Sequence, residues 1–358
     1  MFAVIMAGGS GTRFWPTSRK DKPKQFLKIG SQDPMVVETC DRLKTLVSDD
    51  EIIIVLGREH LVEAQRLLDA RKVHMLAEPV GRNTAPCIGL SAIHASHLGC
   101  NEPVAFMPAD HFIRDAAAFV EALRDAARIA ESGAIVTLGI IPTRPETGYG
   151  YIRRSESHTG ATKGMAYRVS AFVEKPDLQK AEQYLASGEY FWNAGIFVAT
   201  PETILRQMKH HLPDLYDGLS RLKRALGTAL FESEMEKVYG ELEAISFDHG
   251  IMEKTKEPVF VIPCECGWSD VGSWASLYEL REMDVDKDRN LVDGETVLID
   301  CEGNLVFGQS GRLVACLGLK NCLVVDTPEA LLVADLNRSQ EIGEIVKKLR
   351  EAKKNKFL

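Results

Sequence analysis

The sequence lacks the features of membrane and nucleic-acid-binding proteins. No apolar run approaches the roughly 20 residues that a membrane-spanning helix needs. No leader pattern precedes the first apolar segment, which begins directly at Phe2. The formal net charge of −8 argues against a nucleic-acid-binding surface. We therefore expect a cytoplasmic protein without membrane or nucleic-acid partners.

Two familiar phosphate-binding patterns are also missing. Neither Gly-Lys-Ser nor Gly-Lys-Thr occurs, which excludes a Walker A loop. Counted from Gly9 and Gly11, the third glycine of a dinucleotide fingerprint would fall on Phe14. A dinucleotide-binding dehydrogenase is therefore disfavoured.

Cysteine spacing gives little sign of a metal centre. The chain has 8 cysteines, and only Cys264 and Cys266 lie close together in sequence. With no second pair or histidine cluster, this spacing is weak support for zinc. Buried free thiols are the default in a cytosolic chain, and the role of this pair is left open.

The N-terminal segment carries chemistry that suits a nucleoside triphosphate. A short apolar run typical of a buried strand leads into Gly8-Gly9-Ser10-Gly11, and Arg13, Lys22 and Lys24 follow. Glycines let backbone N–H groups approach an anion, and fixed cations neutralise its charge. The alternative is a strand-to-helix turn with basic residues nearby by chance.

The first part of the chain reads as alternating strands and helices. Apolar segments at 2–7, 51–57, 73–78 and 104–110 predict buried strands, with amphipathic patterns between them. This order indicates a Rossmann-like α/β domain with a mixed, mostly parallel sheet. In such sheets ligands lie beyond the carboxyl ends of the strands, where Gly8, Glu78 and Asp110 fall.

The composition changes after residue 285. A polar linker at 286–290 is followed by short strand patterns at regular spacing and a closing amphipathic helix. We therefore divide the chain into a domain at 1–285 and a small β domain at 286–358. The pattern alone also allows a small antiparallel sheet.

Two separated motifs each present an aspartate. Asp110 ends Met-Pro-Ala-Asp before His111, and Asp270 lies within Gly-Trp-Ser-Asp-Val-Gly. Two carboxylates with phosphate oxygens form a typical Mg²⁺ environment. Each aspartate alone is as compatible with a turn or helix cap, and His111 is expected to be a hydrogen-bonded structural histidine.

Taken together, these motifs resemble the nucleotidyl-sugar pyrophosphorylases. The run from Ala7 to Gln25 carries the resemblance, and Trp15-Pro16 and Lys22-Pro-Lys-Gln-Phe-Leu27 point to the mannose-1-phosphate guanylyltransferases. The resemblance implies a nucleotidyltransferase domain of the GT-A/Rossmann-like type and a left-handed β-helix-like C-terminal domain used in dimer packing. It also implies Mg²⁺ as cofactor, held by Asp110 and Asp270.

The same resemblance implies roles for individual residues. The catalytic residues would be Arg13, Lys24, Asp110 and Asp270. The nucleotide would contact Ala7, Gly8, Gly9, Ser10, Gly11, Thr12, Glu78, Arg82, Asn83 and Thr84. The sugar phosphate would contact Gly148, Glu174, Lys175 and Asn193.

Structural interpretations stand beside these roles. Asn83 or Thr84 would serve as the N-cap of the helix that opens near Pro86. Taken singly, the sugar-site residues are ordinary turn and strand-end residues. The motif from Asp248 to Lys254 either lines the sugar site or packs behind it.

The implied reaction transfers GMP from GTP to α-D-mannose 1-phosphate, giving GDP-mannose and pyrophosphate. The nearest alternative is a related pyrophosphorylase with a different base or sugar 1-phosphate. A more distant alternative is a non-catalytic nucleotide-sugar sensor. A homodimer is expected from the β domain.

Overall fold

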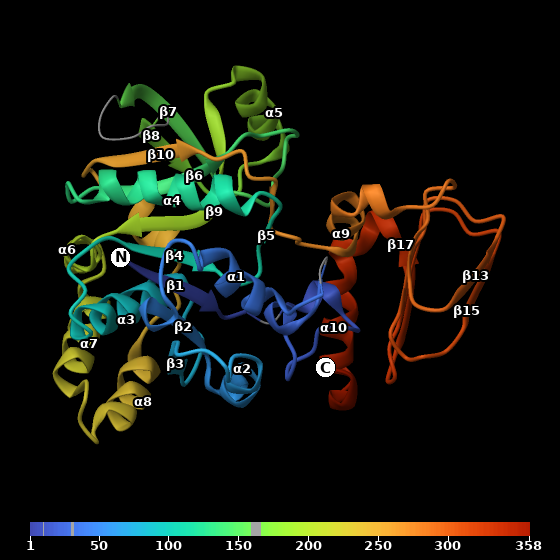
Figure 1. Ribbon diagram of the computed structural model, residues 1–358, viewed down its shortest axis with the longest axis horizontal. Helices are drawn as coiled ribbons and strands as arrows, with labels where there is room; N and C mark the ends of the chain where they lie inside the picture. The colour runs from blue at the N-terminus through green and yellow to red at the C-terminus, as the bar shows by residue number, and fades with distance from the viewer. Residues whose placement is uncertain (10, 30–31, 159–165) are drawn as a thin grey trace. The chain divides into compact units, whose positions relative to one another are not determined.

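The structure is a computed structural model that describes the chain apart from residues 10, 30–31 and 159–165. The chain forms two compact units (Figure 1). Unit 1 contains Met1–Gly8, Thr39–Ala109 and Ile113–Trp268, and unit 2 contains Gly9–Glu38, Asp110–Phe112 and Ser269–Leu358. The glycine-rich run therefore begins in unit 1 and continues in unit 2.

Unit 1 is built on a nine-stranded mixed sheet in the order β3-β2-β1-β4-β9-β6-β10-β8-β7. Its strands are β1 (Phe2–Ala7), β2 (Ile52–Gly57), β3 (His74–Glu78), β4 (Val104–Pro108), β6 (Ile135–Ile140), β7 (Tyr151–His158), β8 (Ala166–Val173), β9 (Tyr190–Ala199) and β10 (Val259–Pro263). The neighbouring pairs β3–β2, β2–β1 and β1–β4 are parallel. The pair β6–β10 is also parallel. The pairings of β9, β8 and β7 are antiparallel. The predicted Rossmann-like mixed sheet is confirmed.

The central strands are buried without alternation. Every residue of the run 52–56 is buried, as expected of a parallel strand covered on both faces. The helices of this unit are α2 (Leu61–Leu67), α3 (Thr84–His97), α4 (Ala116–Ala130), α5 (Leu178–Ser187), α6 (Pro201–His211), α7 (Pro213–Ala225) and α8 (Phe231–Glu241). α3 packs on β1, β2, α6 and α7, while α4 packs on β6, β9 and β10. The helix α1 (Met35–Leu43) begins in unit 2 and ends in unit 1.

A glycine in α3 sets how closely α7 and α6 approach. A Cβ added to Gly89 would collide with Leu219 of α7 and lie 2.8 Å from the Met208 sulfur of α6. Close helix packing therefore requires a residue without a side chain here. Leu219 and Met208 belong to a large cluster of buried apolar residues in unit 1.

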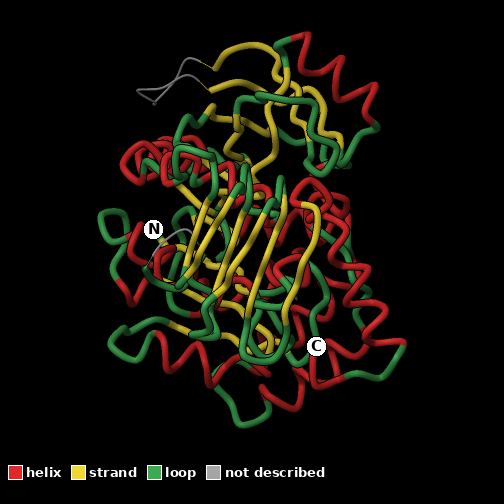
Figure 2. Tube along the Cα trace, turned by 90° about the vertical axis from the view of Figure 1, so that its right-hand side faces the viewer, coloured by secondary structure: helices red, strands yellow, loops and turns green. Residues whose placement is uncertain are grey.

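Unit 2 contains two stacks of short parallel strands, as expected of a β-helix. One stack pairs β12 (Leu291–Asp293), β14 (Leu305–Gly308) and β16 (Cys322–Asp326), and the other pairs β13 (Thr296–Ile299) with β15 (Val314–Leu317). β17 (Leu331–Asp335) closes the first stack in antiparallel orientation. Figure 2 shows such strands side by side with short turns between them.

Repeated side chains fix the register of these coils. Leu291, Leu305 and Leu323 lie in register and are all buried. The Asn304 side chain donates to the Asn290 amide oxygen at 2.8 Å and accepts from the Cys322 N–H at 2.8 Å. Because both asparagines are buried, these bonds satisfy polar groups that would otherwise destabilise the turns.

An N-terminal segment is part of the unit 2 core. The Phe14 ring lies 5.0 Å from the Trp274 ring, which lies 5.2 Å from Phe307. The Trp15 indole N–H donates to the Phe357 carbonyl at 2.7 Å. Residues 9–38 therefore pack with the C-terminal segment that begins at Ser269, a contact that no local pattern in the sequence reveals.

Several elements differ from the expectations. α8 and the short α9 (Trp274–Leu280) were not predicted, because few of their residues are buried and the apolar period is weak. The 286–290 segment is an ordered turn in which the Asp286 carboxylate accepts from the N–H groups of Asp288 and Asn290. The closing helix is confirmed as α10 (Ile342–Glu351). Within the described residues, no helix is long and apolar enough to span a bilayer.

A half-buried histidine in α3, whose two ring nitrogens are buried, makes unit 1 sensitive to acid. The His94 ring lies 5.7 Å from that of His74 and 6.5 Å from that of His97. Neither ring nitrogen of His94 has a hydrogen-bond partner among the described residues. Burial and then the two neighbouring histidines lower the pKa of His94 to about 4.

We predict that unit 1 loses stability as the pH falls from about 6.5 to about 4. The unfolded chain takes up the His94 proton near pH 6.5, whereas the folded chain resists it until about pH 4. The linkage is worth about 2–3 kcal/mol. Denaturant unfolding at pH 7 and pH 4.5 should show that the free energy of unfolding falls less between these pH values in His94→Leu than in the native chain. His210→Leu, an exposed control, should lose as much free energy of unfolding between these pH values as the native chain does. An equal decrease in all three chains would contradict the prediction.

Candidate functional site

The glycine-rich run leaves β1 as an open turn. Ala7 is buried at the end of the strand, whereas Gly8 and Gly9 are exposed, with open space where a Cβ would lie. Ser10 lies outside the described residues. Gly9 has a φ of +102°, which favours glycine. Backbone N–H groups in such a turn can face an anion without side-chain hindrance.

Gly11 is required by its contact with Lys24. Its φ is +53°, and a Cβ added there would lie 2.8 Å from the Lys24 backbone nitrogen and 2.8 Å from its Cβ. The Gly11 carbonyl accepts from the Ser18 hydroxyl at 2.5 Å. Thr12 begins the short 3₁₀ helix that follows. The glycine therefore lets the loop lie directly against the backbone of Lys24.

Lys24 joins the two predicted metal-binding aspartates. Its side chain is only 7% exposed. The ammonium donates to the Asp110 carbonyl at 2.7 Å, the Asp110 carboxylate at 3.0 Å and the Asp270 carbonyl at 2.6 Å. These three acceptors match the three N–H donors of a lysine. All three residues belong to unit 2.

The two aspartates differ in their surroundings. Burial opposes ionisation of Asp110, but the charges of Lys24 and then His111 lower the pKa of its carboxyl below the ordinary value. The Asp270 carboxylate accepts from the Gly272 N–H at 3.1 Å within a tight turn. Asp110 is therefore an anion held against a cation, with a side chain that is still 35% exposed.

The fourth predicted catalytic residue lies apart from this cluster. Arg13 is exposed, and its guanidinium donates to the Gln340 amide oxygen at 3.3 Å. Of the predicted catalytic residues, the structure therefore brings together Lys24, Asp110 and Asp270. No group of three or more metal-ligating side chains occurs among the described residues. A divalent ion would need phosphate or water oxygens besides the two aspartates.

Glu78 is a buried carboxyl at the end of β3. It accepts from the Tyr239 hydroxyl at 2.9 Å. Burial raises the pKa of Glu78 to about 7, and the Tyr239 hydrogen bond only partly opposes this. A carboxyl balanced near neutrality in this position is typical of a functional site.

The residues after Glu78 hold the surrounding backbone. The Arg82 guanidinium donates to the carbonyls of Tyr239 at 2.8 Å and Gly240 at 3.3 Å. The Asn83 side chain accepts from the Thr84 N–H, which confirms the N-cap interpretation for Asn83. The Thr84 hydroxyl accepts from the Phe247 N–H at 2.8 Å. The side chains of Arg82 and Thr84 therefore join this turn to the 239–247 segment.

Three predicted sugar-site residues gather around Gly150. A Cβ added to Gly150 would lie 2.5 Å from a Glu174 carboxylate oxygen and 3.2 Å from the Asn193 Cβ. The Lys175 ammonium lies 2.8 Å from the other Glu174 oxygen. Gly148 lies nearby in the chain, where its N–H donates to the Glu146 carboxylate at 3.0 Å.

Asp248 completes this cluster from a π-helical turn, η5 (Asp248–Met252). Its carboxylate accepts from the Asn193 side-chain amide at 2.7 Å, while the Asn193 amide oxygen accepts from the Gly195 N–H at 3.0 Å. Burial and then the negative charge of Glu174 raise the pKa of Asp248 to about 6. π-Helical turns often occur at functional sites.

Positive φ angles mark the same segments. Asn83, Lys175 and Val271 have φ values of +69°, +47° and +42°. Such angles are costly for residues with a Cβ and are frequently retained at functional sites. One lies in each of three predicted site segments, although Arg289, Asp300, Asn321 and Lys353 outside those segments also have positive φ angles.

The chain matches known proteins over nearly its whole length. Residues 2–287 match the nucleotidyl transferase family, and residues 294–349 match the MannoseP isomerase/GMP-like beta-helix domain. The mannose-1-phosphate guanylyltransferase of Escherichia coli (strain K12) is 38% identical over 98% of this chain and 73% of its own length. That of Salmonella montevideo is 39% identical over 97% and 73%. This chain belongs to the mannose-1-phosphate guanylyltransferase family.

A solved structure agrees with this assignment. The Thermus thermophilus protein named mannose-1-phosphate geranyltransferase superposes with a TM-score of 0.87 at 36% identity, over 98% of this chain and 99% of its own. The match covers both the nucleotidyltransferase fold and the C-terminal β domain. These matches confirm the family and the fold class that the sequence predicted.

Two residues of this family member were not among the predicted site residues. Tyr239 has no motif signal, because its partner Glu78 is 161 residues away in the sequence. Asp248 does have a signal, the Asp-His-Gly-Ile-Met-Glu motif, but the sequence left open whether it lines the site. Its bond to Asn193 places it in direct contact with a predicted site residue.

The cysteine pair forms a separate buried feature of unit 1. Cys264 and Cys266 are both free and buried. The hydrogen bond between their thiols lowers the pKa of Cys266 and raises that of Cys264. The Cys266 carbonyl accepts from the N–H groups of Arg114 and Asp115, so this segment is fixed by backbone bonds.

We predict that Asp248→Asn stabilises the fold at pH 8. The unfolded carboxyl loses its proton near pH 4, but the folded one keeps it until about pH 6, so stability falls as the pH rises between these values. Removing the charge should recover roughly 1–3 kcal/mol at pH 8 and little at pH 4. Thermal unfolding at both pH values tests this. Glu253→Gln, which removes an exposed carboxylate near the same turn, should give no gain; a destabilised Asp248→Asn at pH 8 would refute the prediction.

Proposed function

We propose that this protein transfers GMP from GTP to α-D-mannose 1-phosphate, releasing pyrophosphate and forming GDP-mannose. The names of relatives 38–39% identical over almost the whole chain support this substrate pair. The Lys24 cluster is the structural observation that carries the proposal, because it joins a phosphate-type loop to two carboxylates. A sensor that only binds nucleotide sugars has no need of this arrangement.

The chemistry requires positioning and charge neutralisation. An oxygen of the sugar phosphate, which is ionised near neutral pH, attacks the α-phosphorus of GTP in line with the departing pyrophosphate. No protein nucleophile is needed, so fixed cations and backbone N–H groups supply the catalysis. Backbone N–H groups of Gly8–Thr12 and the exposed Arg13 hold the β- and γ-phosphates. Lys24 stabilises charge near the α-phosphate.

For the metal we propose Mg²⁺, held by Asp110 and Asp270. Mg²⁺ is commonly held by one or two carboxylates together with substrate phosphates and waters, which fits a pair of aspartates gathered on one lysine. When bound, it would polarise the phosphate oxygens. Lys24 fixes the backbone of both aspartates and keeps the Asp110 side chain ionised.

We infer that Glu78 contributes to guanine recognition. Guanine presents N–H donors, and a carboxylate accepts them in its ionised form. Because the pKa of Glu78 is raised to about 7, donors from a bound base would favour its ionisation. Arg82, Asn83 and Thr84 shape the nucleotide site through the backbone that they hold.

For the sugar phosphate we propose Glu174, Lys175, Asn193 and Gly148. Glu174 accepts from sugar hydroxyls, and the exposed Lys175 ammonium exchanges its carboxylate partner for the phosphate. Asn193 offers its remaining N–H to a hydroxyl, and Asp248 fixes the orientation of that amide.

Cellular location and domain boundaries complete the proposal. A cytoplasmic location is supported by eight cysteines that are all free. We propose a nucleotidyltransferase domain at 1–285 and a β domain at 286–358. The family matches at 2–287 and 294–349 support this division.

We also propose a homodimer formed through the β domain. The outward face of β13 and β15 is apolar, with Val297 beside Ala315 and Ile299 beside Leu317. Leu317 is 70% exposed and Ile299 is 53% exposed. An apolar face of this kind on two adjacent strands favours association.

Pyrophosphate release tests the reaction and its catalytic residues together. Turnover should be highest with GTP and mannose 1-phosphate among four nucleoside triphosphates and several sugar 1-phosphates. Lys24→Ala and Asp270→Asn should each lower turnover by about 10²–10³. Asp270→Asn keeps the carbonyl that Lys24 uses, so its fold should be intact, and Lys347→Ala on α10 serves as an exposed control. A preference for another base, or near-native turnover in Asp270→Asn, would overturn the corresponding part of the proposal.

Charge placed on the apolar face tests the dimer. Ile299→Lys with Leu317→Lys should convert the dimer to a monomer, because two lysines would be buried against apolar partners. Light scattering after gel filtration measures the mass. Lys347→Glu with Lys348→Glu on α10 is the surface control. A native chain that is monomeric at micromolar concentration, or a variant that stays dimeric, contradicts the proposal.

A further inference from the structure

A basic groove follows α6 in unit 1, among residues to which no role has been assigned. One cavity of about 530 Å³ is lined by Arg206, Lys209, His210, His211, Lys254, Lys256 and Glu257. A second, of about 380 Å³, shares Arg206 and Lys209 with it. Both volumes lie within the roughly 300–1,000 Å³ of small-ligand sites. We name these two cavities, which share two lining residues, the α6 groove.

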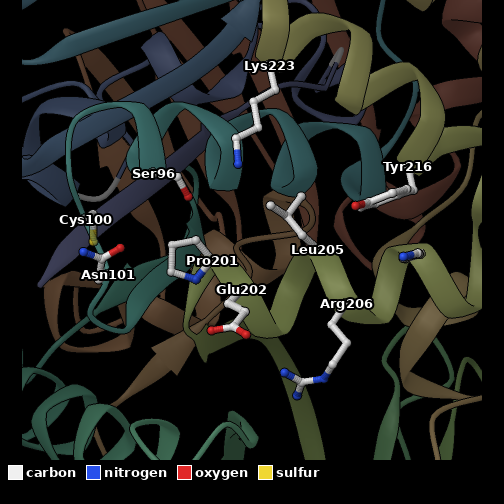
Figure 3. Close-up of a pocket in the computed structure, with 10 residues that line it drawn as sticks. Ser96, Cys100, Asn101, Pro201, Glu202, Leu205, Arg206, Tyr216 and Lys223 are labelled. Atoms are coloured by element: carbon white, nitrogen blue, oxygen red, sulfur yellow. The ribbon is translucent and has the colours of Figure 1, made fainter.

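The second cavity lies between three helices. Figure 3 shows Lys223 and Tyr216 of α7 facing Leu205 of α6, with Ser96 near the end of α3. Lys223 extends its ammonium toward the space between the helices (Figure 3). Lys209 lies over the Tyr216 ring at 5.7 Å from its centre. This part of the groove therefore combines cations with an apolar wall.

The larger cavity is lined by one arginine and three lysines but by a single carboxylate. That carboxylate, Glu257, is already bound by the Arg206 guanidinium at 2.8 Å. Hydrogen bonds from Arg206 and Gln207 lower the pKa of Glu257, although burial opposes them. Among the described residues, no ion pair within 4.0 Å joins Lys209, Lys254 or Lys256 to an acidic side chain. Positive charge therefore exceeds negative charge in the larger cavity, in a chain whose net charge is −8; the second cavity adds Lys223 and one further carboxylate, Glu202.

Helix electrostatics account for only part of this cluster. Lys209, His210 and His211 are the last residues of α6, where the helix dipole favours cations. Lys254 and Lys256 come from a different segment, after η5, and line the same cavity. Their convergence brings like charges together at a cost that a bound anion would offset.

One histidine of the groove, His211, is sensitive to the same positive charge. Burial, then His210 and Lys254, lower the pKa of His211, and the nearby Glu257 carboxylate opposes them. An anion in the groove would reverse that effect and favour protonated histidine. Binding should therefore be accompanied by proton uptake near neutral pH.

From these observations we propose that the α6 groove is a second anion site that binds a diphosphate group. Cations from α6 and from the segment after η5 line one cavity and can contact several charged oxygens at once, which a single phosphate offers less well. Two sources supply this chemistry: free pyrophosphate and the diphosphate of a nucleotide or nucleotide sugar. The site uses none of the residues assigned to the transfer reaction, so it stands or falls independently of the proposed function.

Calorimetric titration of the full chain tests this site. Inorganic pyrophosphate, GDP and GDP-mannose are the three probes, with inorganic phosphate as the single-phosphate comparison. For at least one diphosphate probe, the native chain should bind a second equivalent. The groove variant Lys209→Gln/Lys254→Gln/Lys256→Gln should not bind this second equivalent, or should bind it at least about tenfold more weakly. Lys347→Gln/Lys348→Gln/Lys354→Gln removes the same charge elsewhere and should retain it. The probe that shows the second equivalent identifies the source.

Further readouts separate this site from general charge effects. Titration in two buffers of different ionisation enthalpy should reveal proton uptake in the native and control chains but not in the groove variant. The groove variant should keep native turnover with GTP and mannose 1-phosphate in the absence of added diphosphate. One equivalent in the native chain for every probe, an unchanged second equivalent in the groove variant, or equal affinity for inorganic phosphate would overturn the proposal.

Discussion

The hydrogen bonds of the Lys24 ammonium are the interaction on which the proposed catalytic part of unit 2 depends. It is buried, and its three donors are taken by oxygens of Asp110 and Asp270, residues 86 and 246 positions away in the sequence. A buried cation without such partners would be too costly to keep. The lysine therefore fixes both aspartates, and Gly11 must lack a side chain so that the glycine-rich loop can lie against it.

The residues proposed to recognise base and sugar follow the opposite arrangement. Glu78 and Asp248 are carboxyls with raised pKa values, and neither forms an ion pair with a cation among the described residues. Each instead accepts one neutral hydrogen bond, from Tyr239 and from Asn193. These groups lower the stability of unit 1 at neutral pH, and a substrate with N–H or O–H donors would supply the missing partners.

The sequence predicted the local features and missed the distant ones. Gly8, Glu78 and Asp110 were correctly placed near strand ends, because buried strands and the turns after them can be predicted from neighbouring residues. The Asn83 cap was also predictable for this reason. The contacts that were missed join residues far apart in the chain. They are the Tyr239 hydrogen bond to Glu78, the Arg82 hydrogen bond to the Tyr239 carbonyl and the packing of Phe14 on Trp274. No periodicity records such contacts, so only the folded structure reveals them.

The two basic clusters of the protein differ in what neutralises them. Around Lys24, backbone and carboxylate oxygens satisfy the cation before any substrate arrives, so the lysine acts by position as well as by charge. Along α6, Lys254 and Lys256 are exposed and face other cations, while Glu257 is already bound by Arg206. Charge that is compensated internally contributes to structure, whereas charge left facing a cavity is available to a ligand. The same principle that makes Lys24 a structural centre therefore makes the α6 groove a binding surface.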